Sequence, residues 1–238
     1  SYGYNATNRS NSKGKYMSNI LCTICARGGS KGVKNKNIRP IAGLPLIAHT
    51  INQAKECGLF KHIVISTDSD EIASTAQKYG AEVFFKRDSA LASDTAGKLA
   101  VIRDALLKSQ EYYKHKFDYI IDLDATSPLR LSSDINMAFE QFMRDDNDIL
   151  ITATPSRRSP YFNLIEKIDG KINLSKTLPN QILRRQDAPA TYDMNASIYI
   201  WKSLVLLNNN TLFLPKTGLY VMPANRSIDI DDELDFMI

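Results

Sequence analysis

The sequence of 238 residues has few of the features that would place it in a specialised class of protein. It contains three cysteines, too few for a disulfide framework, which favours a reducing compartment. No apolar run approaches the roughly 20 residues of a membrane-spanning helix, and the polar N-terminal segment lacks the apolar core of a secretory signal. We therefore expect a cytoplasmic protein without a membrane partner.

Basic charge is also scarce outside the N-terminal segment. Arg9, Lys13 and Lys15 carry most of the net charge of +4, so the rest of the chain is nearly neutral. A nucleic-acid-binding domain would carry a basic surface on its folded part, so we expect no nucleic-acid partner. We interpret residues 1–16 as a disordered or added tail and residues 17–238, beginning at Met17, as one domain.

Two of the cysteines, Cys22 and Cys25, form the Cys-x-x-C pattern of redox and zinc sites. They fall in a predicted strand, where positions i and i+3 point to opposite faces. The other soft ligands form no second pair at ligand spacing: Cys57, His49, His62 and His115. We expect buried structural cysteines, and a thiol-redox module is the alternative.

Strands and helices alternate along most of the chain. Short β-branched or apolar runs predict strands, and apolar residues at helical spacing predict helices. The predicted strands are 20–25, 62–67, 82–85, 118–123 and 148–154, and the helices between them are 44–57, 70–79, 96–113 and 132–143. This order predicts an α/β, Rossmann-like, mainly parallel sheet with helices on both faces, which binds ligands beyond the carboxyl ends of its strands.

The alternation breaks at about Pro155. Residues 161–168 and 171–174, separated by Asp169-Gly170, predict a β-hairpin that is too small to be a domain. An irregular run follows the hairpin. Beyond it we predict strands at 196–201 and 219–222 and a final helix from residue 231.

A glycine-rich basic loop, residues 26–37, follows the first strand. Gly28 and Gly29 free backbone N–H groups to face a ligand, and the cations suit a polyanion such as a triphosphate. The four cations are Arg27, Lys31, Lys34 and Lys36. The spacing does not satisfy the P-loop pattern, and a solvated basic turn is the alternative.

The loop resembles the N-terminal signature of the acylneuraminate cytidylyltransferases, the CMP-sialic acid synthetase family, which runs roughly A-R-x-G-S-K-x-x-x-x-K-N. The residues in register are Arg27, Ser30, Lys31, Lys36 and Asn37. The resemblance implies transfer of CMP from CTP to the C2 hydroxyl of a nonulosonic acid, a nine-carbon acidic sugar, with Mg²⁺ as cofactor. It also implies a homodimer, with residues 155–190 as the inserted dimerisation element of a nucleotide-diphosphosugar-transferase-like domain.

Several residues take roles from this resemblance. Arg27, Lys31 and Lys36 are expected to stabilise charge during catalysis. The expected nucleotide contacts are Arg27, Gly28, Gly29, Ser30, Asn37, Arg87 and Ser127. Arg87 opens a stretch that resembles the family pattern ending in Asp94-Thr95, although that pair is equally a helix cap. Lys98 stands where many relatives carry a small hydroxyl residue.

A second signature, Thr-Ser-Pro-Leu-Arg at residues 126–130, follows the fourth strand. Asp124 precedes it, where most sialic-acid enzymes have glutamine. A carboxylate facing an anionic sugar needs hydrogen-bond donors or a cation, so we expect Asp124 to read hydroxyl or amide groups or to help hold metal. With aspartate at this position, the sequence resembles the branch of the family that uses legionaminic-type sugars.

Two later stretches also resemble the family. Arginine can grip a carboxylate in two parallel hydrogen bonds, so Arg184 or Arg185, from either subunit, is the expected clamp for the sugar acid. A salt bridge at the rim of the dimer contact is the alternative. The sugar site implied by the resemblance comprises Asp124, Arg184, Arg185, Gln186, Tyr192 and Asn195.

The last stretch supplies a pair of acids. Asp229 and Asp231 are two apart in a predicted strand end, hence on one face, and two hard carboxylates suit Mg²⁺ bridging phosphate oxygens. In the family the Asp-x-Asp pair binds the metal. Capping of the final helix by Asp231 and Asp232 is the alternative. A cytidylyltransferase for the eight-carbon acid KDO and a non-catalytic nucleotide-binding protein are the alternative functions.

Overall fold

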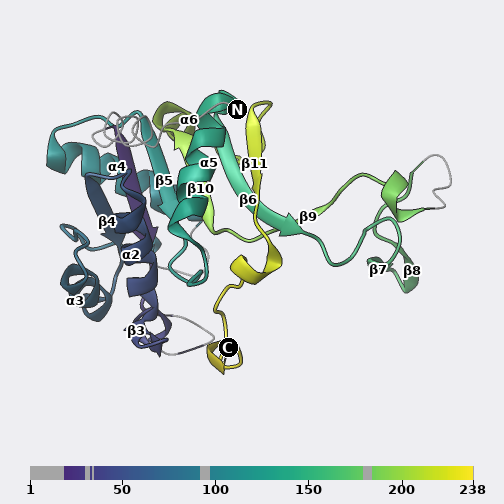
Figure 1. Cartoon of the computed structure of the whole chain (residues 1–238), viewed down its shortest axis with the longest axis horizontal. Helices are drawn as coiled ribbons and strands as arrows, with labels where there is room; N and C mark the ends of the chain where they lie inside the picture. The colour runs from purple at the N-terminus through teal and green to yellow at the C-terminus, as the bar shows by residue number, and fades with distance from the viewer. Residues whose placement is uncertain (1–18, 30–32, 34, 92–96, 179–183, 238) are drawn as a thin grey trace, which may run out of the picture.

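The computed structural model of the chain describes residues 19–29, 33, 35–91, 97–178 and 184–237. These residues build one central sheet with helices on both faces and an arm that projects away from it (Figure 1). The predicted α/β class, with a mainly parallel sheet covered on both faces, is confirmed.

The sheet has the strand order β11-β6-β10-β5-β1-β4, and β9 pairs with the end of β6. Its strands are β1 (Ile20–Cys25), β4 (His62–Ser66), β5 (Tyr119–Leu123), β6 (Ile149–Pro155), β9 (Tyr192–Met194), β10 (Ile198–Lys202) and β11 (Thr217–Val221). β1 is parallel to β4 and β5, and β11 is parallel to β6, whereas β10 runs antiparallel between β5 and β6. The carboxyl ends of β1, β4 and β5 therefore meet at one edge of the sheet.

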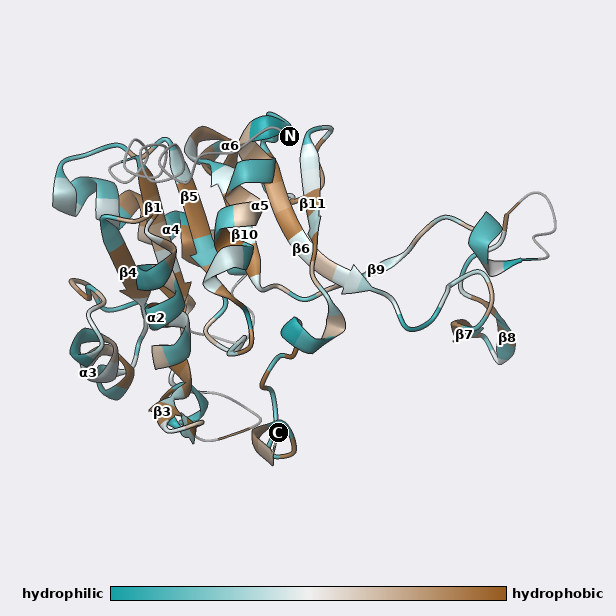
Figure 2. Cartoon of the chain, viewed as in Figure 1, coloured by the Kyte–Doolittle hydropathy of each residue, from teal (hydrophilic) through white to brown (hydrophobic). Residues whose placement is uncertain are grey.

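Helices cover both faces because two apolar clusters lie on opposite sides of the sheet. The helices are α2 (Leu46–Cys57), α3 (Asp70–Lys78), α4 (Lys98–Tyr113), α5 (Ser132–Arg144) and α6 (Ser203–Asn208). Residues of α2, α3 and α5 pack in one cluster, and residues of α4 and α6 pack in the other. The buried strands between them are strongly apolar, as a sheet covered on both faces requires (Figure 2).

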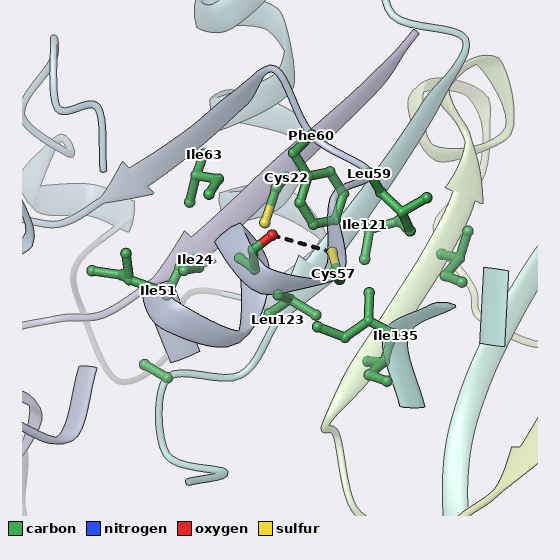
Figure 3. Packing of buried hydrophobic residues seen from close by; sticks show 14 of the residues in the cluster. Cys22, Ile24, Ile51, Cys57, Leu59, Phe60, Ile63, Ile121, Leu123 and Ile135 are labelled. Carbon is green, nitrogen blue, oxygen red and sulfur yellow. Dashed lines mark hydrogen bonds between the residues drawn. The ribbon is translucent and has the colours of Figure 1, made fainter. Parts of the chain in front are cut away.

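The Cys-x-x-C pair is split between these two clusters. Cys22 is fully buried in the first cluster, near Cys57, whose thiol donates to the carbonyl of Ala54 at 3.1 Å (Figure 3). Cys25 packs against the second cluster. Burial raises the pKa of both the Cys22 and the Cys25 thiols, which keeps them protonated and inert. Cys22 and Cys57 are buried as expected, whereas Cys25 is only partly buried.

Three predicted elements differ from the structure. The strand predicted at 82–85 reduces to a single bridge between Val64 and Glu82, because Phe84 turns to stack on Tyr112 of α4 at 4.0 Å. The helix predicted from Leu44 begins only at Leu46, after a short pairing of β2 (Pro40–Ile41) with β3 (Leu44–Pro45). The prediction of a final helix from residue 231 is wrong, because the described part of this segment forms only the 3-10 turn η5 (Asp235–Met237).

Ser69 caps α3 and accepts a hydrogen bond from the Ile72 N–H at 3.2 Å. The proposed cap Asp94-Thr95 lies outside the described residues.

The arm leaves the body at the end of the β6–β9 pair and carries the hairpin β7 (Ile165–Ile168) and β8 (Lys171–Leu174) (Figure 1). The predicted hairpin is confirmed, although its first strand is shorter than expected. Asp169 and Gly170 both have positive φ, 51° and 78°, as a two-residue hairpin turn requires. Every residue of the two strands is exposed.

Arg130 locks the loop that follows β5. Its side chain is fully buried, and burial lowers the pKa of its guanidinium to about 10. Its guanidinium donates hydrogen bonds to the Gln53 Oε1 at 2.9 Å and to the Thr50 hydroxyl at 3.0 Å. It also donates to the carbonyls of Ser197 and Asp124, at 2.5 and 3.0 Å. Each acceptor would lose a partner without it.

We predict that Arg130→Met lowers the free energy of unfolding by about 3 kcal/mol, because several buried acceptors lose their donor at once. Arg144→Met is the control, since Arg144 is exposed and pairs only with its neighbour Asp145; it should change stability by less than about 0.5 kcal/mol. Urea unfolding followed by circular dichroism measures both. Equal stability of the two variants would contradict the role of Arg130.

No helix in the part of the chain that the structure describes is both long and apolar enough to cross a membrane.

Candidate active site

A polar cavity of about 380 Å³ lies where β1 and β5 end. Its wall combines four cations with three acids. The cations are Arg27, Lys36, Arg87 and Lys98, and the acids are Asp124, Asp229 and Asp231. The predicted site residues that the structure brings together in this wall are Arg27, Lys36, Asn37, Arg87, Asp124, Asp229 and Asp231, whereas Gly28 and Gly29 are not among the residues that line it.

The glycine loop forms one side of this cavity. The Gly28 N–H donates to Asp68 Oδ1 at 2.7 Å, which ties the start of the loop to the end of β4. Asn37 is buried on the 3-10 turn η1 (Lys36–Ile38), and its Nδ2 donates to the Arg27 carbonyl at 3.3 Å. Among the described residues its Oδ1 has no hydrogen-bond partner, so it can accept from a ligand. Ser30 and Lys31 lie outside the described residues.

Arg87 reaches the cavity from the segment after β4. Its Nε donates to Ser66 Oγ at 3.0 Å and its terminal nitrogen to the Ser66 carbonyl at 2.7 Å. The Arg87 N–H also donates to the Thr67 carbonyl at 2.9 Å. These contacts fix the buried guanidinium at the edge of the sheet and leave part of it facing the cavity.

The acids approach from the loop after β5 and from the C-terminal segment. Asp124 Oδ1 accepts hydrogen bonds from the Thr126 N–H at 2.8 Å and from its hydroxyl at 2.6 Å. The same hydroxyl also contacts Asp229 Oδ1. The strand predicted for Asp229 and Asp231 is wrong: residues 227–231 have no regular secondary structure and are held by the hydrogen bond from the Ile230 N–H to the Thr126 carbonyl at 2.9 Å.

Although they lie outside any strand, Asp229 and Asp231 both line the cavity, because the buried Ile230 between them points the other way. Burial and the nearby charges of Asp124 and Asp231 raise the pKa of Asp229 to about 7. The positive charge of Lys36 lowers the pKa of Asp229 but does not cancel this rise. The Lys36 Nζ lies 3.9 Å from Asp231. Crowded, hard oxygen ligands of this kind fit a divalent cation.

In the described part of the chain no group of three or more His, Cys, Asp or Glu side chains is arranged to hold a metal ion. The aspartate pair would therefore need oxygen ligands from a substrate or from water to complete a coordination shell. This is how Mg²⁺ is commonly held beside phosphates.

An ion pair at the cavity, between the buried Asp122 and the partly exposed Lys98, was missed by the sequence reasoning. Asp122 of β5 accepts from the Thr23 hydroxyl at 2.7 Å, and its other oxygen lies 4.0 Å from Lys98 Nζ, which sits 4.5 Å above the Tyr199 ring. Burial lowers the pKa of Lys98, but the charges of Asp122 and Asp124 outweigh it, so the pKa is raised. The sequence signal that could have indicated this pair is the carboxylate of Asp122 inside the otherwise apolar run Tyr-Ile-Ile-Asp-Leu.

Ser127 and Asn195, predicted to contact the nucleotide and the sugar, also lie outside the cavity wall. Ser127 is buried beneath the loop and is not among the lining residues. Asn195 instead links β6 to the C-terminal segment: its Oδ1 accepts from the Thr152 hydroxyl at 2.7 Å, and its Nδ2 donates to Ser227 Oγ at 3.1 Å.

The other predicted sugar ligands belong to the base of the arm. Gln186 and Tyr192 line a second cavity of about 310 Å³, together with Pro155, Ser156, Ser159, Ala188, Pro189, Ala190 and Thr191. Arg184 is exposed and pairs with Asp187 at 3.4 Å. The backbone of Arg185 lies in the 3-10 turn η3 (Arg185–Asp187), and its side chain lies outside the described part of the chain. Of the predicted sugar ligands whose side chains the structure describes, only Asp124 lines the first cavity.

Known proteins resemble this chain over most of its length. The profile of the family described as Cytidylyltransferase matches residues 21–235. Post-translational flagellin modification protein B of Campylobacter coli is 62% identical over 222 residues, covering 93% of this chain and 94% of that protein. The CMP-N,N'-diacetyllegionaminic acid synthase of Campylobacter jejuni subsp. jejuni serotype O:2 is 60% identical over 222 residues, with the same coverage.

Among solved structures, CMP:2-keto-3-deoxy-manno-octonic acid synthetase complexed with CTP superposes with a TM-score of 0.64. The match covers 91% of this chain and 95% of that one, at 16% sequence identity. At this identity the likeness shows the fold alone.

The two loop glycines allow a matched test of how closely the loop is packed. A Cβ on Gly28 would lie 2.9 Å from Ser69 Cβ, whereas a Cβ on Gly29 would meet nothing within 4 Å. We predict that Gly28→Ala lowers the free energy of unfolding by about 1–3 kcal/mol, because Ser69 and the start of α3 must shift. Gly29→Ala should leave it nearly unchanged. Thermal unfolding compares them, and equal losses would contradict the predicted packing.

Proposed function

The chain belongs to the cytidylyltransferase family, and from this premise we propose that it transfers CMP from CTP to the C2 hydroxyl of a nonulosonic acid and releases pyrophosphate. The proposed substrate is of the legionaminic type, as the printed name of the relative at 60% identity suggests. The product would be an activated sugar for surface glycan or glycoprotein biosynthesis.

The observation that carries this proposal is the charge pattern of the first cavity. Arg27 and Lys36 lie on the side of the glycine loop, and Asp229 and Asp231 line the same cavity. A triphosphate needs cations around its oxygens, and a divalent ion needs hard carboxylates beside that triphosphate. One cavity offers both.

The residues of the chain would act by positioning and by charge. Arg27, Lys36 and Lys31 would bind the phosphates and stabilise the leaving pyrophosphate. The Gly28 N–H, expected from the sequence to face the ligand, is instead taken up by Asp68. Asn37 and Arg87 would orient the nucleoside. Asp229 and Asp231 would hold Mg²⁺, which when bound supplies positive charge to the phosphate oxygens. The C2 hydroxyl then attacks the α-phosphorus in line, so the chain supplies no covalent intermediate.

Asp124 is the proposed reader of the sugar within the same cavity. Its Oδ1 already accepts from Thr126, and its remaining acceptor capacity can meet hydroxyl or amide hydrogens of the substrate. Arg184, Arg185, Gln186 and Tyr192 lie on the arm, so we propose that they serve the active site of a partner subunit. Arg184 or Arg185 would then clamp the sugar carboxylate.

The arm supports a homodimer through the face of its hairpin. Ile165 pairs with Leu174, and Ile172 lies on the same face as both, with exposed fractions of 62%, 37% and 63%. A two-stranded hairpin is marginally stable on its own, and an apolar face of this kind favours burial against another subunit.

The other two functions have less support. The KDO enzyme shares 16% identity with this chain, which supports a common fold and no particular sugar. A non-catalytic nucleotide-binding protein would have no use for Asp229 and Asp231 in the cavity, where their like charges are costly without a cation.

The activity can be tested directly. We expect the purified protein with CTP and Mg²⁺ to release pyrophosphate when given N,N'-diacetyllegionaminic acid, and to be slower with N-acetylneuraminic acid and with KDO. Mass spectrometry should detect the CMP-sugar. Absence of pyrophosphate release with every nonulosonic acid would overturn the proposed reaction, and preference for KDO would favour the alternative.

We expect Asp231→Asn to lower kcat/KM by about 100-fold or more, because the variant loses a charge that would hold the cation. The control is Asp232→Asn, since Asp232 is outside the cavity wall and pairs with the backbone of Asp235. Equal activities of the two variants would remove the metal assignment.

For the dimer, we predict that Ile165→Asp combined with Ile172→Asp yields a monomer in sedimentation velocity, because charge cannot be buried in an apolar contact. Turnover should fall while CTP binding persists. Ile168→Asp is the matched control: Ile168 is 62% exposed but lies on the opposite face of the hairpin, so this variant should remain dimeric. A monomeric wild type would contradict the prediction.

A further inference from the structure

Thr126 is the point where the loop after β5 meets the C-terminal segment. Its N–H and its hydroxyl both contact Asp124 Oδ1, at 2.8 and 2.6 Å. The hydroxyl also contacts Asp229 Oδ1, and the Thr126 carbonyl accepts from the Ile230 N–H at 2.9 Å. One residue therefore joins the proposed sugar-reading carboxylate to the proposed metal-holding one.

We propose that Thr126 is a positioning residue that sets the separation of Asp124 and Asp229, and that the affinity of the site for a divalent cation depends on its hydroxyl. This inference rests on the proposed function, because it takes Asp229 as a cation ligand. It assigns a role to a residue that would touch neither the metal nor the reacting atoms.

The physical reason is repulsion between two carboxylates in a partly buried cavity. Like charges at short range in low dielectric repel strongly, and side chains that can rotate will move apart. A hydroxyl placed between the two oxygens offers its one proton and its dipole to both carboxylates, which lowers the cost of keeping them close. Without it Asp229 would be free to rotate away from the cavity.

The main-chain contacts allow this role to be separated from folding. The C-terminal segment is anchored by the fully buried Ile230 and by its hydrogen bond to the Thr126 carbonyl, neither of which uses the hydroxyl. Arg130 independently holds the Asp124 carbonyl at 3.0 Å. Replacing the hydroxyl by a methyl group should therefore change the side chain of Asp229 and leave the path of the backbone unchanged.

The test uses Mn²⁺ as the probe, with binding to the full-length protein measured by electron paramagnetic resonance with and without CTP. We expect Thr126→Val to weaken Mn²⁺ binding by about 10–100-fold, which is the usual effect of removing a group that orients a metal ligand. Thr126→Ser keeps the hydroxyl and should bind within about 3-fold of wild type. Melting temperatures of all three proteins check the fold.

A double-mutant cycle tests the mechanism. If the hydroxyl acts by keeping two charges together, then removing the charge of Asp124 should reduce the need for it. Adding Asp124→Asn to Thr126→Val should then recover much of the lost Mn²⁺ affinity. If Thr126→Val alone folds poorly, Thr126→Ala, which also removes the hydroxyl, takes its place in the cycle.

Kinetics provide a readout that a purely structural role would not move. The apparent Mg²⁺ constant of Thr126→Val should rise, and part of its lost kcat should return at saturating Mg²⁺. Unchanged Mn²⁺ binding in a folded Thr126→Val variant would overturn the inference alone. Failure of the wild type to bind Mn²⁺ both with and without CTP would instead overturn the metal role of Asp229 in the proposed function.

Discussion

Repulsion among three carboxylates is the constraint around which the carboxyl edge of the sheet is built. Asp124, Asp229 and Asp231 share a cavity with four cations, and the ion pair between Lys36 and Asp231 is 3.9 Å long, near the outer limit of such contacts. Hydrogen bonds from Thr126 hold two of the acids, and Arg130 holds the loop beneath them. Lys36 therefore keeps much of its capacity for an anionic ligand.

The parts of this arrangement that depend on local sequence were predictable. Alternating strands and helices indicated the parallel sheet. Because parallel strands end at the same edge of a sheet, the glycine loop and the Asp124 loop could be placed together at that edge. The Asp169-Gly170 pair predicted the hairpin turn because few other residues adopt positive φ at both positions. Cys22 and Cys25 could be assigned to opposite faces from strand periodicity alone.

The parts that depend on tertiary contacts were not predictable. Residues 227–231 are held outside any strand by the burial of Ile230 and its hydrogen bond to Thr126, and no local pattern distinguishes this segment from a strand. Phe84 leaves the sheet to stack on Tyr112, a partner 28 positions away. The pairing of Lys98 with Asp122 and the bridge made by Thr126 both join segments that periodicity treats separately.

Both early and late portions of the polypeptide are needed to form the cavity, because its described wall comes from residues 25–27, 36–37, 87, 91, 98, 101, 124–126, 229 and 231. During synthesis the amino-terminal strands can begin to associate while later residues are still in the ribosome. The glycine loop would meanwhile lack the carboxylates that face it. A complete cavity wall therefore forms only after residues 229–231 have been synthesised.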